Sequence, residues 1–310
     1  MPFVSRNFTL SSPMPAYLFV MQTLNINQAQ AQRFIHKGCM EINGQALTKT
    51  GERICGEITL RVFEPEKRPY DMFAPLVDDD DILVFEKPSG ILVHPNTRIA
   101  PFSMLDVVRW YGGKDANIVH RIDKETSGLL VASKHKKAEI ELKNSFQDRK
   151  VFKRYYAWVD GEIKDSFSVS EPLSKNDSFE SLKHKALLDP LGKPSHTDFK
   201  PIYYDPMIDA TLLECIPLTG RMHQIRVHLF HVKHPILGDP LYATSFKISN
   251  EYLDGRLSQE KRKLFTGASR LMLHAEKIEF LYGEKRFSIE SKINFDKMKY
   301  LISSQRILEK

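Results

Sequence analysis

The chain has 310 residues, of which 42% are hydrophobic and 27% are charged, and its formal net charge is +6. That composition is typical of a globular protein, and the length is sufficient for a large core plus an accessory module. The basic surplus is compatible with a nucleic-acid ligand, although many proteins without such a ligand share it.

Several classes of protein are excluded by what the sequence lacks. Cys39, Cys55 and Cys215 are widely separated and form no CxxC pair, which argues against a disulfide framework or a cysteine zinc site. The first residues lack the basic start and continuous apolar run of a signal peptide. No apolar stretch approaches the roughly 20 residues that span a bilayer. The sequence therefore predicts a cytoplasmic protein with free thiols and no membrane contact.

The first elements along the chain are short. Residues 1–14 are expected to be irregular. The segment Asn27–Ile35 has helical character, and Gly38 suits the end of that helix. Residues 40–47 alternate between polar and apolar side chains around an Asn-Gly turn, which predicts a hairpin. Residues 56–63 alternate again, as expected of a closing strand.

This order of helix, glycine, hairpin and strand resembles an S4-like RNA-binding module over residues 15–65. The basic pair that is usual at the start of the module's helix is replaced here by Gln and Ala, so a generic small α/β cap remains an alternative. Glu64–Pro69 contains two prolines and several charges and is expected to be a linker. The rest of the chain, residues 66–310, is expected to form a second domain.

Strands dominate the prediction in this second domain. Helices are predicted where Ala138, Leu142 and Phe146 recur every four residues and again at Gln224–Phe230. Residues 244–269 are expected to be a surface excursion. The pattern predicts an α+β fold with a mixed, mostly antiparallel sheet and peripheral helices. The expected strands are 82–85, 91–93, 129–132, 155–159, 197–203, 210–216, 278–282 and 287–289.

The most informative stretch is His120–Val131, with the sequence HRIDKETSGLLV. Its aspartate, Asp123, lies between basic residues, and a Thr-Ser-Gly turn and a buried strand are expected to follow. A strand does not need an arginine and an aspartate directly before it, whereas a site that holds a reactive carboxylate against a polyanion does. In isolation, a turn or cap aspartate would be the favoured interpretation of Asp123, and the other segments of the chain reverse that preference.

Other segments occur in a fixed order around this stretch, and together they closely resemble the RluA-type pseudouridine synthases. The resemblance covers roughly residues 70 to 295, and the ordered set is highly specific although each segment alone is weak. The segments are DILVFEKPSGILVHP (81–95), KRYYAWVDG (153–161), LTGRMHQIRVHL (218–229), HPILGD (234–239) and RLMLHA (270–275).

The resemblance implies an isomerase that needs no metal and no cofactor. Pseudouridine forms when the bond between ribose C1′ and uracil N1 breaks and the base turns and rejoins through C5. This chemistry needs a carboxylate near the sugar and a surface that holds the loose base. By resemblance, the carboxylate is Asp123, the active-site tyrosine is Tyr155 and the basic partner of the aspartate is Arg226. An arginine beside a buried carboxylate keeps it ionised and can bind it through two hydrogen bonds.

The remaining candidate residues concern RNA. Arg121 is expected to take the place of the extruded base or to contact a phosphate, and Arg221 to contact a phosphate or form a structural ion pair. Leu129 and Ile225 are expected to form apolar walls. Lys153 belongs to a basic run that suits phosphate tracking, although the solvated face of a helix would explain about half of it. The run comprises Lys134, Lys136, Lys137, Lys143, Arg149, Lys150, Lys153 and Arg154.

The expected target is 23S ribosomal RNA, because the S4-like module is shared with family members that act there, and transfer RNA is the alternative. A monomer suffices. A non-catalytic RNA-binding or ribosome assembly factor would leave Asp123, Tyr155 and Arg226 without a reason to occur together. A glycoside hydrolase would need two carboxylates in such motifs. No metal-ligand spacing is matched by the histidines, which are His223, His228, His231 and His234.

Overall fold

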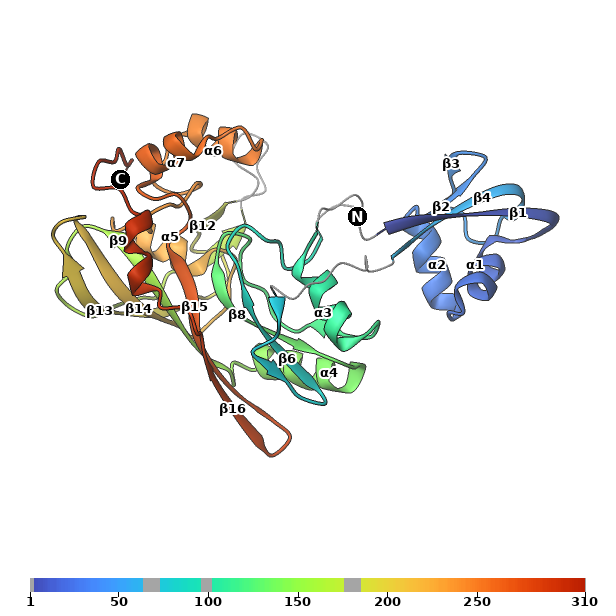
Figure 1. The fold of residues 1–310 in the computed structure, drawn as a ribbon, viewed down its shortest axis with the longest axis horizontal. Helices are drawn as coiled ribbons and strands as arrows, with labels where there is room; N and C mark the ends of the chain where they lie inside the picture. The colour runs from blue at the N-terminus through green and yellow to red at the C-terminus, as the bar shows by residue number, and fades with distance from the viewer. Residues whose placement is uncertain (1–2, 64–72, 96–101, 176–184, 310) are drawn as a thin grey trace. The chain divides into compact units, whose positions relative to one another are not determined.

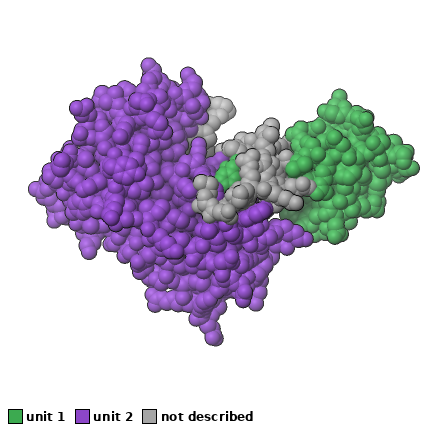
Figure 2. Space-filling model, viewed as in Figure 1, with its two compact units in different colours: residues 1–69, 95–102 green, residues 70–94, 103–310 purple. Residues whose placement is uncertain are grey.

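The computed structural model describes residues 3–63, 73–95, 102–175 and 185–309 (Figure 1). The chain divides into two compact units, which Figure 2 shows in separate colours: unit 1 comprises residues 1–69 and 95–102, and unit 2 comprises residues 70–94 and 103–310. Each unit has a hydrophobic core of its own. The linker predicted at Glu64–Pro69 lies outside the described residues.

Unit 1 is an antiparallel sheet with two helices packed against it. Its strand order is β1-β4-β2-β3. The prediction that residues 1–14 are irregular is wrong, because β1 pairs with β4 along most of its length. Helix α1 was also not predicted. The elements are β1 (Phe3–Pro15), α1 (Ala16–Leu24), α2 (Gln28–His36), β2 (Met40–Ile42), β3 (Gln45–Ala46) and β4 (Arg53–Phe63).

The predicted helix and hairpin of unit 1 are confirmed, and local chemistry explains both. Asn27 accepts a hydrogen bond from the backbone of Gln30, whose side chain in turn accepts from the backbone of Asn27, which forms a capping box at the start of α2. The chain turns at Gly38, which has a φ of 64°. Asn43 and Gly44 both have positive φ between β2 and β3, as a tight hairpin turn requires.

Unit 2 is built on a ten-stranded sheet that has the order β10-β13-β14-β9-β15-β8-β6-β5, with β16 paired to β15 and β7 paired to β8. Only β15 and β8 run parallel among these pairs, so the mixed, mostly antiparallel sheet is confirmed. The strands are β5 (Val77–Asp78), β6 (Ile82–Lys87), β7 (Asn117–Ile118), β8 (Ser127–Ser133), β9 (Phe152–Asp160), β10 (Phe167–Val169), β13 (Thr197–Asp205), β14 (Ala210–Pro217), β15 (Leu273–Tyr282) and β16 (Lys285–Glu290). A separate pair is formed by β11 (Leu173–Lys175) and β12 (Ala186–Leu188).

The helices of unit 2 differ from the prediction in two places. Helix α3 was not predicted, and the segment 244–269 is not a simple surface excursion, because it holds α6 and α7 and buries Ile248 and Arg262. Residues 91–93 form no strand; Leu92 makes an isolated bridge to Ser103. The helices are α3 (Met104–Gly112), α4 (Lys136–Gln147), α5 (Gln224–His231), α6 (Phe246–Leu253), α7 (Gln259–Thr266) and the 3₁₀ helix η2 (Asp296–Leu301).

Among the described residues, no helix combines the length and the apolar composition that crossing a membrane requires.

One close contact in the sheet brings the two halves of the site together. Ala275 of β15 pairs with Gly128 of β8 on one side and with Tyr155 of β9 on the other. Gly128 has a φ of 107°, and a Cβ atom there would lie 2.2 Å from the carbonyl oxygen of Ala275. Only glycine permits this approach. The loop that leads into β8 is thereby placed near Tyr155.

Candidate active site

The loop between β7 and β8 carries Asp123 and is hydrogen-bonded to the end of β6 and to the turn that follows it. Lys87 is fully buried, and its Nζ atom donates to the carbonyl of Lys124 at 2.9 Å as well as to two carbonyls of its own turn. The hydroxyl of Ser89 donates to the carbonyl of Glu125 at 2.6 Å. Burial lowers the pKa of Lys87 to about 7, although the charges of Glu125 and Asp123 oppose the shift. The loop is therefore fixed by buried backbone contacts.

A buried guanidinium links Asp123 to a second carboxylate. Arg226, in the first turn of α5, donates from Nη1 to Oδ2 of Asp123 at 3.0 Å. Its other edge binds Asp239 through two hydrogen bonds, from Nε at 2.7 Å and from Nη2 at 2.8 Å. The expected Asp123–Arg226 contact is thus present in the structure, but the bidentate partner of the arginine is Asp239. Arg226 is in turn packed against Tyr242, with its guanidinium carbon 5.2 Å from the ring centroid.

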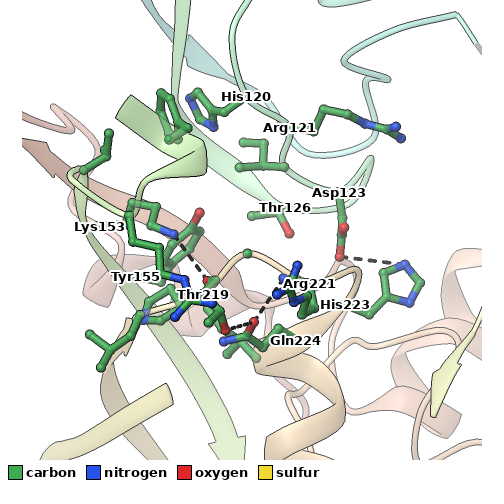
Figure 3. A pocket seen from close by; sticks show the side chains of 18 of the residues that line it. His120, Arg121, Asp123, Thr126, Lys153, Tyr155, Thr219, Arg221, His223 and Gln224 are labelled. Carbon is green, nitrogen blue, oxygen red and sulfur yellow. Dashed lines mark hydrogen bonds and ion pairs between the residues drawn. The ribbon is translucent and has the colours of Figure 1, made fainter. Parts of the chain in front are cut away.

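His223 is the second basic residue beside Asp123. Its Nε2 atom lies 3.9 Å from Oδ2 of Asp123, the contact that the dashed line between these residues marks in Figure 3. The residue precedes α5 in the left-handed region, with a φ of 55°, which is uncommon outside glycine. Its Nδ1 atom shares a hydrogen bond of 3.1 Å with the hydroxyl of Tyr242. The ring is therefore oriented by one nitrogen and presents the other to the carboxylate.

These neighbours determine the charge of Asp123. Burial raises the pKa of the carboxyl group, but the charges of His223 and Arg226 and the hydrogen bond from Arg226 outweigh it, so the pKa lies below its ordinary value of 3.8. The side chain keeps 25% of its surface exposed, and that surface lines the cavity. The site therefore presents an ionised carboxylate to a ligand at neutral pH.

Tyr155 lines the same cavity from β9 (Figure 3). Burial and the negative charge of Asp123 raise the pKa of its hydroxyl. The hydroxyl is therefore protonated at neutral pH and can donate a hydrogen bond or a proton. The ring offers a flat surface on which a base can stack.

The cavity has a volume of about 520 Å³, which is large enough for a nucleotide. Among the described residues that line it, Asp123 is the single carboxylate, and several others are basic. The lining therefore suits a polyanionic ligand. Ile225 lies on the wall as predicted, whereas Leu129 does not: it is 1% exposed and packs from β8 in a hydrophobic core formed with residues of β6, α4 and β15. The basic lining residues are Arg121, Arg149, Lys153, Arg221 and Arg226.

Most of the basic run expected to track phosphates is bound to carboxylates instead. Lys134 pairs with Asp78, and Arg154 lies among three glutamates. Lys136 and Lys143 both pair with Glu139. Only two members of the run, Arg149 and Lys153, line the cavity. The order of the run in the sequence does not show which of its members face the cavity, so these two could not be distinguished from their neighbours.

The three predicted RNA contacts at the cavity differ in their surroundings. Arg121 is exposed, directly before Ile122 and Asp123. Lys153 donates from Nζ to the carbonyl of Thr219 at 3.3 Å, and burial lowers its pKa to about 8. Arg221 donates from Nε to the carbonyl of Pro194 at 3.1 Å. No carboxylate is recorded within ion-pair distance of Arg221 in the described part of the chain, so the structural ion pair that was its alternative role is not seen.

Two residues of the site were missed by sequence reasoning. Asp239 ends the HPILGD segment and His223 lies within the LTGRMHQIRVHL segment, so both stood in motifs already recognised. Neither was assigned a role, because nothing local to either residue shows that it faces Arg226 or Asp123. Two of the other histidines have partners elsewhere in the fold: His228 bonds to Ser195 and Thr197, and His234 bonds to the carbonyl of Asp160.

Residues 81–231 match the model of a family described as RNA pseudouridylate synthase. A protein of Helicobacter pylori strain J99, named an uncharacterized RNA pseudouridine synthase, is 36% identical over 292 residues, which cover 94% of this chain and 96% of that protein. Ribosomal large subunit pseudouridine synthase C of Vibrio vulnificus is 33% identical over 278 residues, which cover 84% of this chain and 82% of that protein.

The fold is shared with a solved structure as well. Human RNA pseudouridylate synthase domain containing 1 superposes with a TM-score of 0.57 at 22% identity, over 71% of this chain and 83% of its own. The family match includes the loop of Asp123, the strand of Tyr155 and the helix of Arg226. With a relative at 36% identity aligned along 94% of its length, this chain belongs to the RluA-type RNA pseudouridine synthases, and it is an isomerase.

Proposed function

We propose that this protein converts specific uridines of large-subunit ribosomal RNA to pseudouridine, with Asp123 as the reacting carboxylate. The observation that carries the proposal is the pairing of Asp123 with Arg226 in a basic cavity that holds no other described carboxylate. Burying a charge is costly unless it is paired, so an ionised aspartate kept at the wall of this cavity by Arg226 supports a chemical role for it.

The reaction asks one carboxylate to act beside the sugar. Asp123 attacks C1′ or removes a proton from C2′, and the bond from C1′ to N1 of uracil breaks with its electron pair passing to the base. The base rotates and its C5 bonds to C1′ as the carboxylate leaves C1′ in the first form, or as the proton returns from Asp123 to C2′ in the second. C5 then loses its proton while N1 gains one. Both forms of the first step require the charged carboxylate, which Arg226 and His223 favour.

Tyr155 holds the freed uracil in this scheme. Its ring provides the stacking surface, and its protonated hydroxyl donates to the base or relays a proton during the loss from C5. The uridine must first leave its stack in the folded RNA, at a cost of a few kcal/mol. Phosphate contacts offset part of that cost, and the basic residues that line the cavity and would make them are Arg121, Arg221 and Lys153.

The choice of ribosomal RNA rests on the relative in Vibrio vulnificus, whose name assigns it to the large ribosomal subunit. We assign the catalytic domain to residues 66–310. Residues 15–65 are assigned to an S4-like module that adds RNA contacts, in keeping with the helix, hairpin and closing strand of unit 1.

The experiment is release of tritium from C5-labelled uridine, with ribosomal RNA and transfer RNA from a strain that lacks the gene as separate substrates. The expected result is release from large-subunit RNA only, at a position that mapping shows to be unmodified in the deletion strain. Release from transfer RNA alone would transfer the activity to that target. No release from either pool would leave the non-catalytic RNA-binding reading.

A further inference from the structure

Helices α6 and α7 contain a buried arginine that the chemistry above does not use. Arg262 of α7 has a side chain that is 10% exposed. Its Nη2 atom donates to Oε2 of Glu125 at 2.7 Å and to the carbonyl of Gly238 at 3.0 Å. Tyr252 of α6 donates its hydroxyl to the other oxygen of Glu125, Oε1, at 2.9 Å. Both oxygens of Glu125 are therefore bound by the α6–α7 segment.

Glu125 lies two residues beyond Asp123 in the same loop. The backbone N–H of Thr126 donates to the carbonyl of Asp123 at 3.2 Å, so the loop closes as a turn around the reacting residue. The hydroxyl of Ser89 holds the carbonyl of Glu125, as described above. Within the described ranges, the Glu125 side chain is the group of this turn that is hydrogen-bonded to the α6–α7 segment.

Helix α7 also binds Gly238, the residue before Asp239. The N–H of Gly238 donates to the carbonyl of Thr266 at 2.6 Å, and its carbonyl accepts from Arg262. Both polar backbone groups of Gly238 are therefore bound by α7. Gly238 has a φ of 78°, and a Cβ atom there would lie 1.6 Å from the carbonyl oxygen of Arg270, so the contact admits no larger residue.

Arg262 consequently contacts two loops, and both of these loops also bind the guanidinium of Arg226. One loop carries Asp123 and the other carries Asp239, and Arg226 is bound by both carboxylates. A displacement of α7 would move the two anchors of Arg226 relative to each other. Shifts of about 1 Å in reacting groups can lower a rate about 100-fold.

The energetics favour positioning over stability as the reason for this ion pair. Buried ion pairs contribute little net stability compared with apolar residues of the same size. Arg262 also carries a cost, because its buried Nε atom has no hydrogen-bond partner among the described residues. Glu125 is nevertheless held in its charged form, since Arg262 and Tyr252 outweigh the effect of burial and lower its pKa.

We infer that Arg262 is a positioning residue for the isomerisation: from α7 it fixes the loops of Asp123 and Asp239 and thereby the contact between Asp123 and Arg226. The inference rests on the proposed function, in which Asp123 is the reacting carboxylate. Neither Arg262 nor Glu125 lines the cavity. The effect of replacing them is therefore expected in turnover and not in RNA binding.

The kinetic test compares four variants of the full chain. Arg262→Met and Glu125→Gln are each expected to lower kcat by about 10- to 100-fold with the KM for RNA unchanged within about twofold. The double variant removes both buried charges, so it should regain thermal stability while kcat stays low. Recovery of kcat together with stability in the double variant would show a purely structural pair and overturn the inference. The matched control is Arg256→Met, which removes an exposed arginine of the same segment and should leave kcat unchanged.

Hydrogen exchange separates this inference from the proposed function, because it needs no activity. The amide of Thr126 is expected to exchange at least about tenfold faster in Arg262→Met and in the double variant, while amides of β13 and β14 keep their protection. Unchanged exchange at Thr126 would sink the inference even if the enzyme is active. A wild-type protein without activity on any RNA, but with faster exchange in the variants, would count against the proposed function alone.

Discussion

The guanidinium of Arg226 donates two hydrogen bonds to Asp239, from Nε at 2.7 Å and from Nη2 at 2.8 Å. The Asp239 side chain is 1% exposed and that of Arg226 is 3% exposed. The pair occupies one edge of the guanidinium and leaves Nη1 for the carboxylate at position 123. Asp239 thus fixes the orientation of the Arg226 guanidinium, and Nη1 remains available to Asp123.

Removal of the charge at position 123 should separate catalysis from binding. Asp123→Asn keeps the size of the side chain and can still accept from Arg226, but it can neither attack C1′ nor remove a proton. We expect kcat to fall by at least about 100-fold, with the dissociation constant for RNA within a factor of about three. Tritium release and filter binding measure the two quantities, and an unimpaired kcat would remove Asp123 from the mechanism.

Replacement of Arg226 alone should damage folding as well as turnover. Arg226→Met leaves two carboxylates, those of Asp123 and Asp239, without their partner. Losing one member of a buried pair costs about 3 to 5 kcal/mol. Urea unfolding can be followed by fluorescence, because both tryptophans, Trp110 and Trp158, belong to unit 2.

A double replacement then isolates the catalytic part. Arg226→Met combined with Asp239→Asn removes the buried pair together, so most of the lost stability should return. Turnover should stay at the level of the single Arg226→Met variant, because Asp123 still lacks its cation. Should turnover recover with stability, Arg226 would act through folding only.

The hydroxyl and the ring of Tyr155 are expected to have separable effects. Tyr155→Phe keeps the stacking surface and removes a group that is protonated at neutral pH, so kcat should fall by about 100-fold while RNA binding changes little. Tyr155→Leu also removes the ring and should weaken RNA binding further, since stacking on an aromatic contributes about 1 to 3 kcal/mol per base. Equal binding by the two variants would argue against stacking.

RNA affinity should depend on pH through Lys153, whose pKa burial lowers to about 8. The amine is charged below that pH and neutral above it, so the attraction for phosphate is lost as the pH rises. Between pH 7 and pH 9 the wild type should lose affinity. Lys153→Arg should show a flatter profile and Lys153→Met should be weak throughout, because neither side chain titrates in this range. Titrations at constant ionic strength would show the difference, and parallel profiles for all three proteins would exclude Lys153 as the cause.

Much of the fold was predictable because its signals are local. The Asn-Gly turn at residues 43–44 and the caps around α2 act within a few residues of chain, and alternation along β4 marks a half-buried strand. The strand β1 escaped prediction because its run of Ser, Arg, Asn and Thr carries little apolar alternation. It is held by its pairing with β4, some 50 residues away in the chain.

The sequence by itself determined the reaction class, because the motifs that contain Asp123, Tyr155 and Arg226 and their order along the chain identify the family without any coordinates. Only the tertiary structure decided which charges pair. Arg226 meets Asp123 across 103 positions of chain, and Arg262 meets Glu125 across 137. Periodicity and turn chemistry describe each segment alone, whereas ion pairs form where β8, α5 and α7 converge. That convergence depends on sheet order and on the close approach that Gly128 allows.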